Sequence, residues 1–507
     1  MTEPYFLDIY SDDDPTQPPI QIFATPEQTD IINAAIRTKD NMLIEALAGS
    51  AKTTTLRFIC KYHPVIPILS LAFNKRIAVT LGKVLPSHVA ARTLNSVGHG
   101  TWQTAIGRKL TLDFKKSYNI VRTIIDHLDK RDRSAAFDSM GAILQAVTAA
   151  KRSGYVPEGK FTHAKPLKTK EEFYLSLEEE PTKFEASLIE RALTNSITAA
   201  YAGTIDFDDQ LYMPTLFGGA FPQFPLVLVD EAQDLSRVNH AMLQKLARTR
   251  VIAVGDPWQS IYGFRGAEQS GMDRIRETYS CVKFPLSVSF RCPEAIVRSA
   301  QFRVPHMKWS KPGGQVSALP SLAASDIPDG SAIICRNNAP LFHLALVLLS
   351  AGRGVHLVGT DLGPQLIKIL SKLGPENLTQ EETYAAIDDW HEERLPKARN
   401  KDTLADKVEC LKVFAGFGSS LGDAIAYCEH LFSGQGPIQL LSGHKAKGLE
   451  WDVVFHLDPW RIPSKWAQSP EEQEQEKNLL YVITTRAREK LFTIDAANIE
   501  ENESVNL

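Results

Sequence analysis

An apolar run that ends in two adjacent carboxylates constrains the fold of this chain more than any other feature. The run spans residues 226–229, Leu-Val-Leu-Val, and Asp230 and Glu231 follow it directly. An uninterrupted apolar run of this kind is typical of a strand that is buried on both faces of a parallel sheet. In open parallel sheets, ligands bind at the carboxyl ends of the strands. We therefore expect an α/β fold with Asp230 and Glu231 at its ligand-binding edge.

A second apolar run supports a functional role for this edge. Residues 251–254 lead into the segment 255–267, which combines Gln259 with aromatic side chains and an arginine. Carboxylates at a strand edge suit a metal ion and water, and aromatic rings can stack on nucleobases. The plainer alternative is a strand that simply ends in solvent, and the second segment argues against it. The two runs together indicate nucleotide hydrolysis coupled to a nucleic-acid strand.

A candidate phosphate-binding loop lies earlier in the chain. Residues 46–53, Ala-Leu-Ala-Gly-Ser-Ala-Lys-Thr, lead from a strand-like segment into a helical one. In this pattern, backbone N–H groups surround the phosphates at a helix N-terminus. Lys52 would contact the β- and γ-phosphates, and Thr53 would offer its hydroxyl to Mg²⁺. Ala46 and Ala51 stand where the pattern has glycine, so the backbone must tolerate a more restricted φ.

Further segments occur in a consistent order, and with them the chain resembles the UvrD/Rep-like superfamily 1 DNA helicases from about residue 22 to about 495. They are residues 23–28 (Phe-Ala-Thr-Pro-Glu-Gln), 71–75, 93–96, 206–209 (Asp-Phe-Asp-Asp), 286–291 (Leu-Ser-Val-Ser-Phe-Arg), 442–450 and 478–487. The resemblance implies two RecA-like P-loop motor domains, each a parallel sheet flanked by helices, with helical insertions. It also implies ATP-dependent unwinding of DNA.

The resemblance assigns roles to individual residues of an ATP and Mg²⁺ site. Catalysis would use Glu231 on the attacking water, Lys52, the γ-phosphate sensor Gln259, and the arginine fingers Arg291 and Arg486. The full set of expected ATP contacts is Gln28, Ala48, Gly49, Ser50, Ala51, Lys52, Thr53, Thr54, Phe290, Arg291, Glu450 and Arg486, and the expected Mg²⁺ ligands are Thr53 and Asp230. An arginine finger can be worth roughly 10³–10⁵ in rate. ATP binding would close the cleft between the motor domains.

Single-stranded DNA and single-strand/duplex junctions are the partners that the resemblance implies. The candidate DNA contacts are Phe73, Asn74, Asn95, Tyr262, Phe264 and His444. Base–aromatic stacking is worth roughly 1–3 kcal/mol per base and tolerates any sequence, which suits a translocase. For His444 a purely structural role is an equal alternative. The segment 259–267 resembles the 3′→5′ branch of the superfamily, and no Gln-Leu-Pro-Pro element of the opposite branch is present.

The chain is too long, at 507 residues, for a single hydrophobic core. From the motif positions we expect a flexible acidic tail over 1–20, a first RecA-like motor domain over 21–95 and 200–285, a helical accessory insertion over 96–199, a second RecA-like motor domain over 286–360 and 436–497, a reduced accessory insertion over 361–435, and a tail over 498–507. Bacterial UvrD and Rep carry a large accessory domain where this chain has the reduced insertion. The chain therefore resembles a compact form of the family.

A run of basic residues lies in the expected helical insertion. It comprises Lys151, Arg152, Lys160, Lys165, Lys168 and Lys170. Such runs most often form a solvated helix face, and a surface that contacts phosphates is the alternative. The sequence leaves both open.

Composition limits the class of protein without identifying its partner. Hydrophobic residues make up 43% of the chain and charged residues 23%, as in ordinary globular proteins. The net charge of −4 still permits a locally positive groove. We expect no membrane segment, and no zinc or iron–sulfur site because the six cysteines show no paired spacing. The expected location is the cytoplasm, in association with the nucleoid, or the host cytoplasm if a phage or a mobile element encodes the protein.

Three other functions are alternatives to the helicase that the resemblance implies. A nuclease would need a further carboxylate cluster, and none follows residue 497. A catalytically dead binding module is opposed by the intact lysine, carboxylates and arginines of the motifs. A translocase that displaces proteins without separating strands stays open, because unwinding depends on how the motor meets the duplex.

Overall fold

The computed structural model describes residues 4–9, 19–72, 74–177, 179–261, 271–359, 362–396, 398 and 400–500. The chain divides into two compact units. The first comprises Met1–Ala46, Ala51–Pro257 and Arg265–Leu286, and the second comprises Leu47–Ser50, Trp258–Phe264 and Ser287–Leu507. Each unit is built on its own parallel sheet, so the predicted fold class is confirmed.

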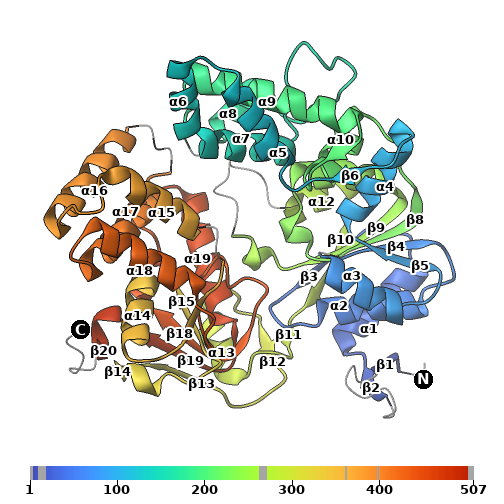
Figure 1. Ribbon diagram of the computed structural model, residues 1–507. Coiled ribbons are helices and arrows are strands. Elements are labelled where there is room, and N and C mark those ends of the chain that lie inside the picture. Colours follow the sequence, from blue (N-terminus) through green and yellow to red (C-terminus); the bar gives the residue numbers. More distant parts are fainter. Residues whose placement is uncertain are drawn as a thin grey trace. The chain divides into compact units, whose positions relative to one another are not determined.

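A six-stranded sheet forms the centre of the first unit, and all its neighbouring strands are parallel (Figure 1). Its order is β10-β3-β9-β8-β4-β5, with β3 (Met42–Ala46), β4 (Ile68–Leu71), β5 (Val89–Arg92), β8 (Phe224–Val229), β9 (Ala247–Gly255) and β10 (Val282–Leu286). The helices that accompany it are α1 (Pro26–Arg37), α2 (Lys52–Tyr62), α3 (Lys75–Val84), α4 (Leu94–Ile106), α10 (Asp209–Phe217), α11 (Arg237–Leu246) and α12 (Gly271–Tyr279).

Strand β8 is the apolar run that precedes Asp230. Leu226 and Leu228 enter one hydrophobic cluster of the unit, and Val227 and Val229 enter another. Because both faces of the strand are covered, the run is apolar without alternation. The strands are parallel, so the residues that follow β3 and β8 emerge at the same edge of the sheet.

A helical bundle is inserted between α4 and α10. It contains α5 (Lys116–Asp126), α6 (Lys130–Asp138), α7 (Met140–Ser153), α8 (Lys170–Leu175) and α9 (Lys183–Tyr201), with the short parallel strands β6 (Thr111–Leu112) and β7 (Thr204–Ile205). Ile125, Ile143 and Ile197 are fully buried in its core. Tyr212 and Met213 of α10 belong to the same cluster, so the bundle is packed on a helix that accompanies the first sheet.

The second unit contains another six-stranded parallel sheet, of order β13-β19-β18-β15-β17-β16. The strands are β13 (Gln315–Ala318), β15 (Ala332–Cys335), β16 (Val355–Leu357), β17 (Ile438–Ser442), β18 (Trp451–Leu457) and β19 (Ala487–Ile494), and the helices beside it in the chain are α13 (Glu294–Ala300), α14 (Ala339–Ser350) and α19 (Pro470–Thr484). No helix within the described ranges of either unit is long and apolar enough to cross a lipid bilayer.

Four helices occupy the segment expected to be a reduced accessory insertion. They are α15 (Leu362–Leu373), α16 (Gln380–Arg394), α17 (Lys401–Phe417) and α18 (Leu421–Ser433). Leu366, Leu411 and Cys428 of these helices share one hydrophobic cluster with Ile333 and Leu440 of the sheet. The described helices are therefore packed into the core of the second unit.

Part of the expected flexible N-terminal tail is a strand. β1 (Phe6–Ile9) pairs antiparallel with β2 (Ile20–Phe23). Leu7 is only 5% exposed and packs with Ile32 of α1 and Phe58 of α2. The prediction of a flexible tail is wrong for these residues, because apolar side chains of β1 pack against α1 and α2.

Candidate active site

The first residues of α2 and the end of β8 meet at the carboxyl edge of the first sheet. Thr53 Oγ1 donates a hydrogen bond of 2.9 Å to Asp230 Oδ2. Burial raises the pKa of Asp230 to about 6, with a further contribution from the Glu231 carboxylate. The positive charge of Lys52 and the Thr53 hydroxyl act in the opposite direction. The structure thus brings together four residues that were predicted from segments about 180 positions apart.

The oxygen donors at this edge fit a magnesium ion. Mg²⁺ keeps several water ligands and binds through one or two carboxylates together with phosphate oxygens. The Thr53 hydroxyl and the Asp230 carboxylate supply donors of this hard type, within hydrogen-bond distance of each other. Among the described residues, no group of three or more His, Cys, Asp or Glu side chains forms a site for a metal held by protein alone.

Glu231 is held in a left-handed conformation beside a residue that the sequence analysis missed. Its φ is 51° and its ψ 45°, and its N–H donates to Asp230 Oδ1 at 2.9 Å. Gln233 Nε2 donates to Glu231 Oε2 at 2.7 Å, while Gln233 Oε1 accepts from the N–H of Asp256 at 3.0 Å. Gln233 therefore links the carboxylate to the residue that follows β9. The sequence did contain a signal for Gln233, because a side-chain amide beside the carboxylates can donate and accept hydrogen bonds at the same time.

One of the two alanines of the candidate phosphate-binding loop, Ala51, has a strained backbone, whereas Ala46 ends strand β3. Ala51 adopts φ 61° and ψ 43°, and Gly49 has φ 71°. Left-handed conformation costs a residue with a Cβ roughly 1–2 kcal/mol. Ser50 is 1% exposed, and its Oγ has no hydrogen-bond partner among the described residues. An unsatisfied buried hydroxyl in a loop that precedes a helix N-terminus suits an anionic ligand.

We expect Ala51→Gly to stabilise the protein by about 1 kcal/mol, because glycine adopts the left-handed conformation without a Cβ clash. Gly49→Ala should have the opposite effect, since a Cβ at Gly49 would lie 2.5 Å from the Cβ of Arg291. Thermal unfolding of both variants measures the difference. Equal melting temperatures for the two variants would show that the loop is not strained.

The middle of the loop packs within the second unit. The N–H of Ala48 donates to the hydroxyl oxygen of Tyr481 at 3.0 Å, and Gly49 O accepts from the N–H of Phe290 at 2.9 Å. The Phe290 side chain is 39% exposed. Tyr481 was not predicted as a site residue, although it lies inside the last motif. Its hydroxyl fixes the backbone of the loop.

The two predicted arginine fingers differ in environment. Arg291 forms an ion pair with Glu450, which also lies 3.6 Å from Arg488. Arg486 is 1% exposed, and its guanidinium donates to the carbonyl oxygens of Val482 and Leu449 at 2.9 and 3.1 Å. Its Nη2 donates a further hydrogen bond of 3.1 Å to Thr485 Oγ1, so several contacts hold the buried guanidinium in place. The finger roles stay predictions.

Two predicted nucleotide contacts are engaged in local structure. Gln28 is 3% exposed, completes the capping box of α1 with Thr25, and donates through Nε2 to Thr55 Oγ1 at 2.9 Å. The carbonyl oxygen of Gln259 accepts a hydrogen bond of 2.7 Å from Lys447 Nζ. Thr54, the remaining predicted contact, is half-buried in α2. The structure thus gives their positions and leaves their roles as predictions.

Only part of the predicted DNA surface lies among the described residues. Phe73, Tyr262 and Phe264 lie outside them. Asn74 caps α3, because its Oδ1 accepts from the N–H of Ile77 at 2.9 Å; His444 lies in a turn after β17.

Asn95 contacts an exposed aromatic residue that the sequence analysis did not select. Its Nδ2 donates to the carbonyl oxygen of Phe207 at 3.1 Å, and the Phe207 side chain is 52% exposed. The Phe207 side chain is accessible, its backbone contacts a residue predicted to bind DNA, and an accessible aromatic ring can stack on a base. In the sequence, Phe207 was marked only by being the one aromatic residue of an otherwise acidic segment. We add Phe207 to Asn95 as a candidate DNA contact.

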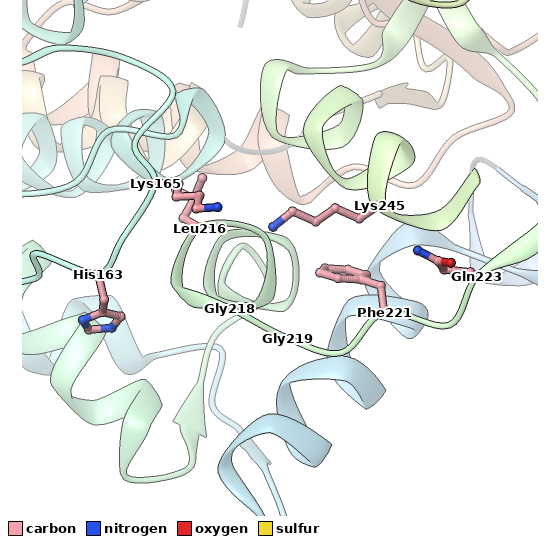
Figure 2. Close-up of a pocket in the computed structure, with 8 residues that line it drawn as sticks. All are labelled: His163, Lys165, Leu216, Gly218, Gly219, Phe221, Gln223 and Lys245. Carbon is pink, nitrogen blue, oxygen red and sulfur yellow. The ribbon is translucent and has the colours of Figure 1, made fainter. Parts of the chain in front are cut away.

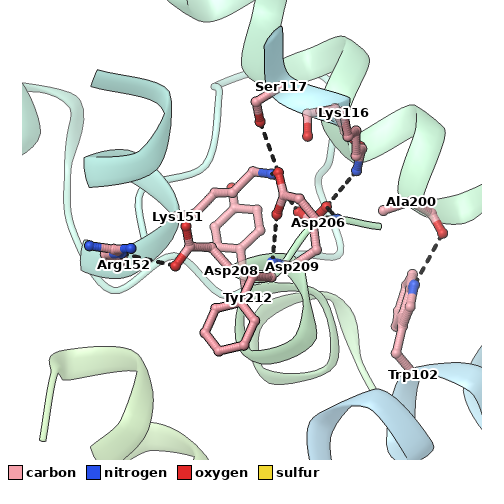
Figure 3. Close-up of polar contacts among 12 residues, drawn as sticks. Trp102, Lys116, Ser117, Lys151, Arg152, Ala200, Asp206, Asp208, Asp209 and Tyr212 are labelled. Carbon is pink, nitrogen blue, oxygen red and sulfur yellow. Dashed lines mark hydrogen bonds and ion pairs between the residues drawn. The ribbon is translucent and has the colours of Figure 1, made fainter. Parts of the chain in front are cut away.

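A buried ion cluster anchors the Asp-Phe-Asp-Asp segment to the helical bundle (Figure 3). Lys151 Nζ lies 2.5 Å from Asp206 Oδ2 and 2.7 Å from Asp209 Oδ1, and Lys116 Nζ lies 2.5 Å from Asp209 Oδ2. Both lysines are at most 2% exposed. Lys151 therefore lies neither on a solvated helix face nor on a surface that contacts phosphates, because its charge is neutralised inside the protein. Arg152, by contrast, is exposed and pairs with a neighbouring carboxylate.

At about pH 8 we expect Asp230→Asn to stabilise the nucleotide-free protein while abolishing Mg²⁺-dependent hydrolysis. A carboxyl group whose pKa rises on folding, here from 3.8 to about 6, contributes stability below the lower value and loses it as the pH rises through the higher one. One pKa unit is worth about 1.4 kcal/mol, so the gain should be roughly 1–3 kcal/mol. Thermal unfolding should show the gain shrinking toward about pH 4. A gain that does not change with pH would contradict the raised pKa.

Comparison with known proteins identifies the family. The description "UvrD/REP helicase N-terminal domain" matches residues 73–280, and the description "UvrD-like helicase C-terminal domain" matches residues 423–498. The two matches together span more than half of the chain. The chain belongs to the UvrD-like family of DNA helicases.

Similar proteins carry helicase names. F-box DNA helicase protein 1 of Schizosaccharomyces pombe is 22% identical over 93% of this chain and 57% of its own length. F-box DNA helicase 1 of Gallus gallus is 25% identical over 93% of this chain and 49% of its own length. The ATP-dependent DNA helicase PcrA of Staphylococcus epidermidis is 26% identical over 55% of this chain and 40% of its own length. The chain thus spans about half the length of the first two relatives.

Proposed function

We propose that the chain is an ATP-dependent motor that moves 3′→5′ on single-stranded DNA and unwinds duplex DNA. The observation that carries the proposal is the hydrogen bond from Thr53 to Asp230, which joins the phosphate-loop helix to the carboxylate pair. Phosphoryl transfer is mainly positioning and charge neutralisation, and these groups supply both.

The proposed chemistry assigns one step to each group. Glu231 accepts a proton from the attacking water, whose oxygen forms a bond to the γ-phosphorus as the bond to the ADP oxygen breaks. Lys52 offsets the negative charge of the phosphates in the bound substrate. Mg²⁺, held by Thr53 and Asp230, would neutralise phosphate charge and orient the phosphate oxygens. Gln233 keeps the Glu231 carboxylate in place through its 2.7 Å hydrogen bond.

The DNA contacts in the proposal combine polar and stacking groups. In the first unit, Asn95 donates to the backbone carbonyl of Phe207, whose side chain is exposed. Tyr262 and Phe264 are stacking residues predicted from the sequence. Stacking on aromatic rings does not select particular bases. A strand bound in this way can move past the site at any sequence.

A second candidate is a translocase that displaces bound proteins without separating strands. It is favoured by the packing of α15–α18, whose buried side chains belong to the core cluster of the second sheet. In this candidate, the four helices take the place that a large accessory domain has in bacterial UvrD and Rep, and their packing against the second sheet supports it.

Unwinding assays on substrates with opposite single-stranded tails test the proposal. The expected result is ATP-dependent unwinding of duplexes that carry a 3′ tail and none from a 5′ tail. Unwinding from a 5′ tail alone would overturn the direction. Displacement of a protein block from single-stranded DNA, without unwinding of either duplex, would select the translocase.

A further inference from the structure

A cavity of about 290 Å³ lies in the first unit, and of its lining residues only Lys165, a member of the basic run, was considered as a phosphate contact from the sequence. Three segments form it (Figure 2). The loop that precedes α8 contributes His163 and Lys165, the end of α10 and the following loop contribute Gly218 and Phe221, and α11 contributes Lys245. The cavity therefore combines two positive charges with an aromatic ring.

The two lysine side chains face the cavity without a carboxylate partner. In Figure 2 the ammonium groups of Lys165 and Lys245 point toward each other, and neither forms an ion pair with a residue that the structure describes. Burial and the charge of Lys165 both lower the pKa of Lys245. Lys245 Nζ donates to the carbonyl oxygen of Thr215 at 2.5 Å and lies 5.3 Å from the centre of the Phe221 ring. A bound anion would relieve the repulsion between the two ammonium groups.

Backbone contacts and two glycines shape the cavity beside the lysines. The N–H of Lys165 donates to the carbonyl oxygen of Leu216 at 2.9 Å, which fixes the loop against the end of α10. Gly218 has φ 101°, and no atom lies within 4 Å of the place where a Cβ would stand. At Gly219 a Cβ would come within 2.6 Å of Thr101 Cγ2. Gly218 and Gly219 thus line the cavity beside the lysines without filling it with side chains.

We propose that this cavity binds one nucleotide unit, with its phosphate between Lys165 and Lys245 and its base against Phe221. Lysine ammonium groups form charge-assisted hydrogen bonds with phosphate, and aromatic rings stack on any base. Ligand sites typically measure roughly 300–1,000 Å³, so a cavity of about 290 Å³ suits a mononucleotide and not a dinucleotide. The unit comes from a free nucleotide or from a DNA strand, which offer the same chemistry.

Calorimetric titration of the full chain tests the proposal. The active site is first filled with a non-hydrolysable ATP analogue and Mg²⁺, and the protein is then titrated with dAMP, with inorganic phosphate and with a short oligothymidylate. Lys165→Gln and Lys245→Gln should each weaken dAMP binding about tenfold or more. Phe221→Ala should weaken dAMP binding and leave phosphate binding unchanged. The control is Lys39→Gln, which removes an exposed lysine of the same unit and should keep the wild-type affinity.

The lysine variants also identify the source of the nucleotide. A loss of dAMP affinity with unchanged oligothymidylate affinity assigns the site to free nucleotides. A parallel loss of both, with a shallower salt dependence of oligothymidylate binding, assigns it to a DNA strand. The exposed Lys165 can be replaced without loss of a buried contact, so thermal unfolding of Lys165→Gln should match the wild type. Absence of dAMP binding by the wild type, or equal affinity of Lys165→Gln and Lys39→Gln, overturns the proposal.

Discussion

Glu231→Gln should lower the rate of ATP hydrolysis by about 10²–10⁴-fold and leave ATP and DNA binding intact. The proposed role of this carboxylate is to accept a proton from water, which an amide of the same shape cannot do. The hydrogen bond from Gln233 to Glu231 Oε2 can be retained by the amide oxygen, so the edge of the sheet should keep its structure. Steady-state hydrolysis and equilibrium nucleotide binding measure the two properties separately. Turnover near the wild-type rate in the presence of DNA would show that another group is the base.

Lys52→Ala provides the contrasting variant. It removes a charge that contacts phosphate in the bound substrate, so ATP affinity itself should fall. Lys39→Ala, at an exposed position of the same unit, controls for the loss of a lysine. Normal ATP affinity in Lys52→Ala would place the phosphates elsewhere.

Lys151→Met should reduce the free energy of unfolding of the first unit by about 3–5 kcal/mol. Lys151 is 1% exposed, with Asp206 at 2.5 Å and Asp209 at 2.7 Å. Its removal leaves two buried carboxylates with Lys116 as the remaining lysine of the cluster. Calorimetric unfolding of the full chain should show the loss in the transition of the unit that contains the cluster.

Arg152→Met is the matched control, because Arg152 is the next residue and pairs with Asp208 at 2.9 Å in an exposed position. Exposed ion pairs contribute about 0–1 kcal/mol. The double variant Lys151→Met with Asp206→Leu should recover part of the stability, since it removes opposite charges together and leaves the pair of Lys116 and Asp209 in place. Equal losses for the two single variants would mean that the buried cluster does not hold the bundle.

The parallel sheets could be predicted because several of their central strands are apolar on both faces. The run before Asp230 forms β8, and the apolar segment Ala332–Cys335 forms β15, which α14 follows in the chain. The contact between Thr53 and Asp230 also followed from the motifs, because parallel strands present their carboxyl ends at one edge. Local sequence patterns were sufficient to predict these features, because buried parallel strands are apolar on both faces and bind ligands at their carboxyl ends.

The buried charges could not be predicted from local patterns. A basic run is most often solvated, and only the fold shows that Lys151 meets Asp206 and Asp209, more than 50 residues away along the chain. The strand Phe6–Ile9 was missed because the acidic residues that follow it dominate the composition of the segment. The link through Gln233 was missed because it depends on the backbone N–H of Asp256, which follows another strand, β9. Each of these features depends on tertiary contacts.

ATP turnover by the full chain, with and without single-stranded DNA, tests the central claim most directly. The account predicts Mg²⁺-dependent hydrolysis that increases with added DNA to a saturating rate, and that is lost in Glu231→Gln. Folded protein that binds no ATP at millimolar nucleotide, or that hydrolyses ATP at the same rate with and without DNA, would contradict the assignment of the chain as a DNA-driven motor.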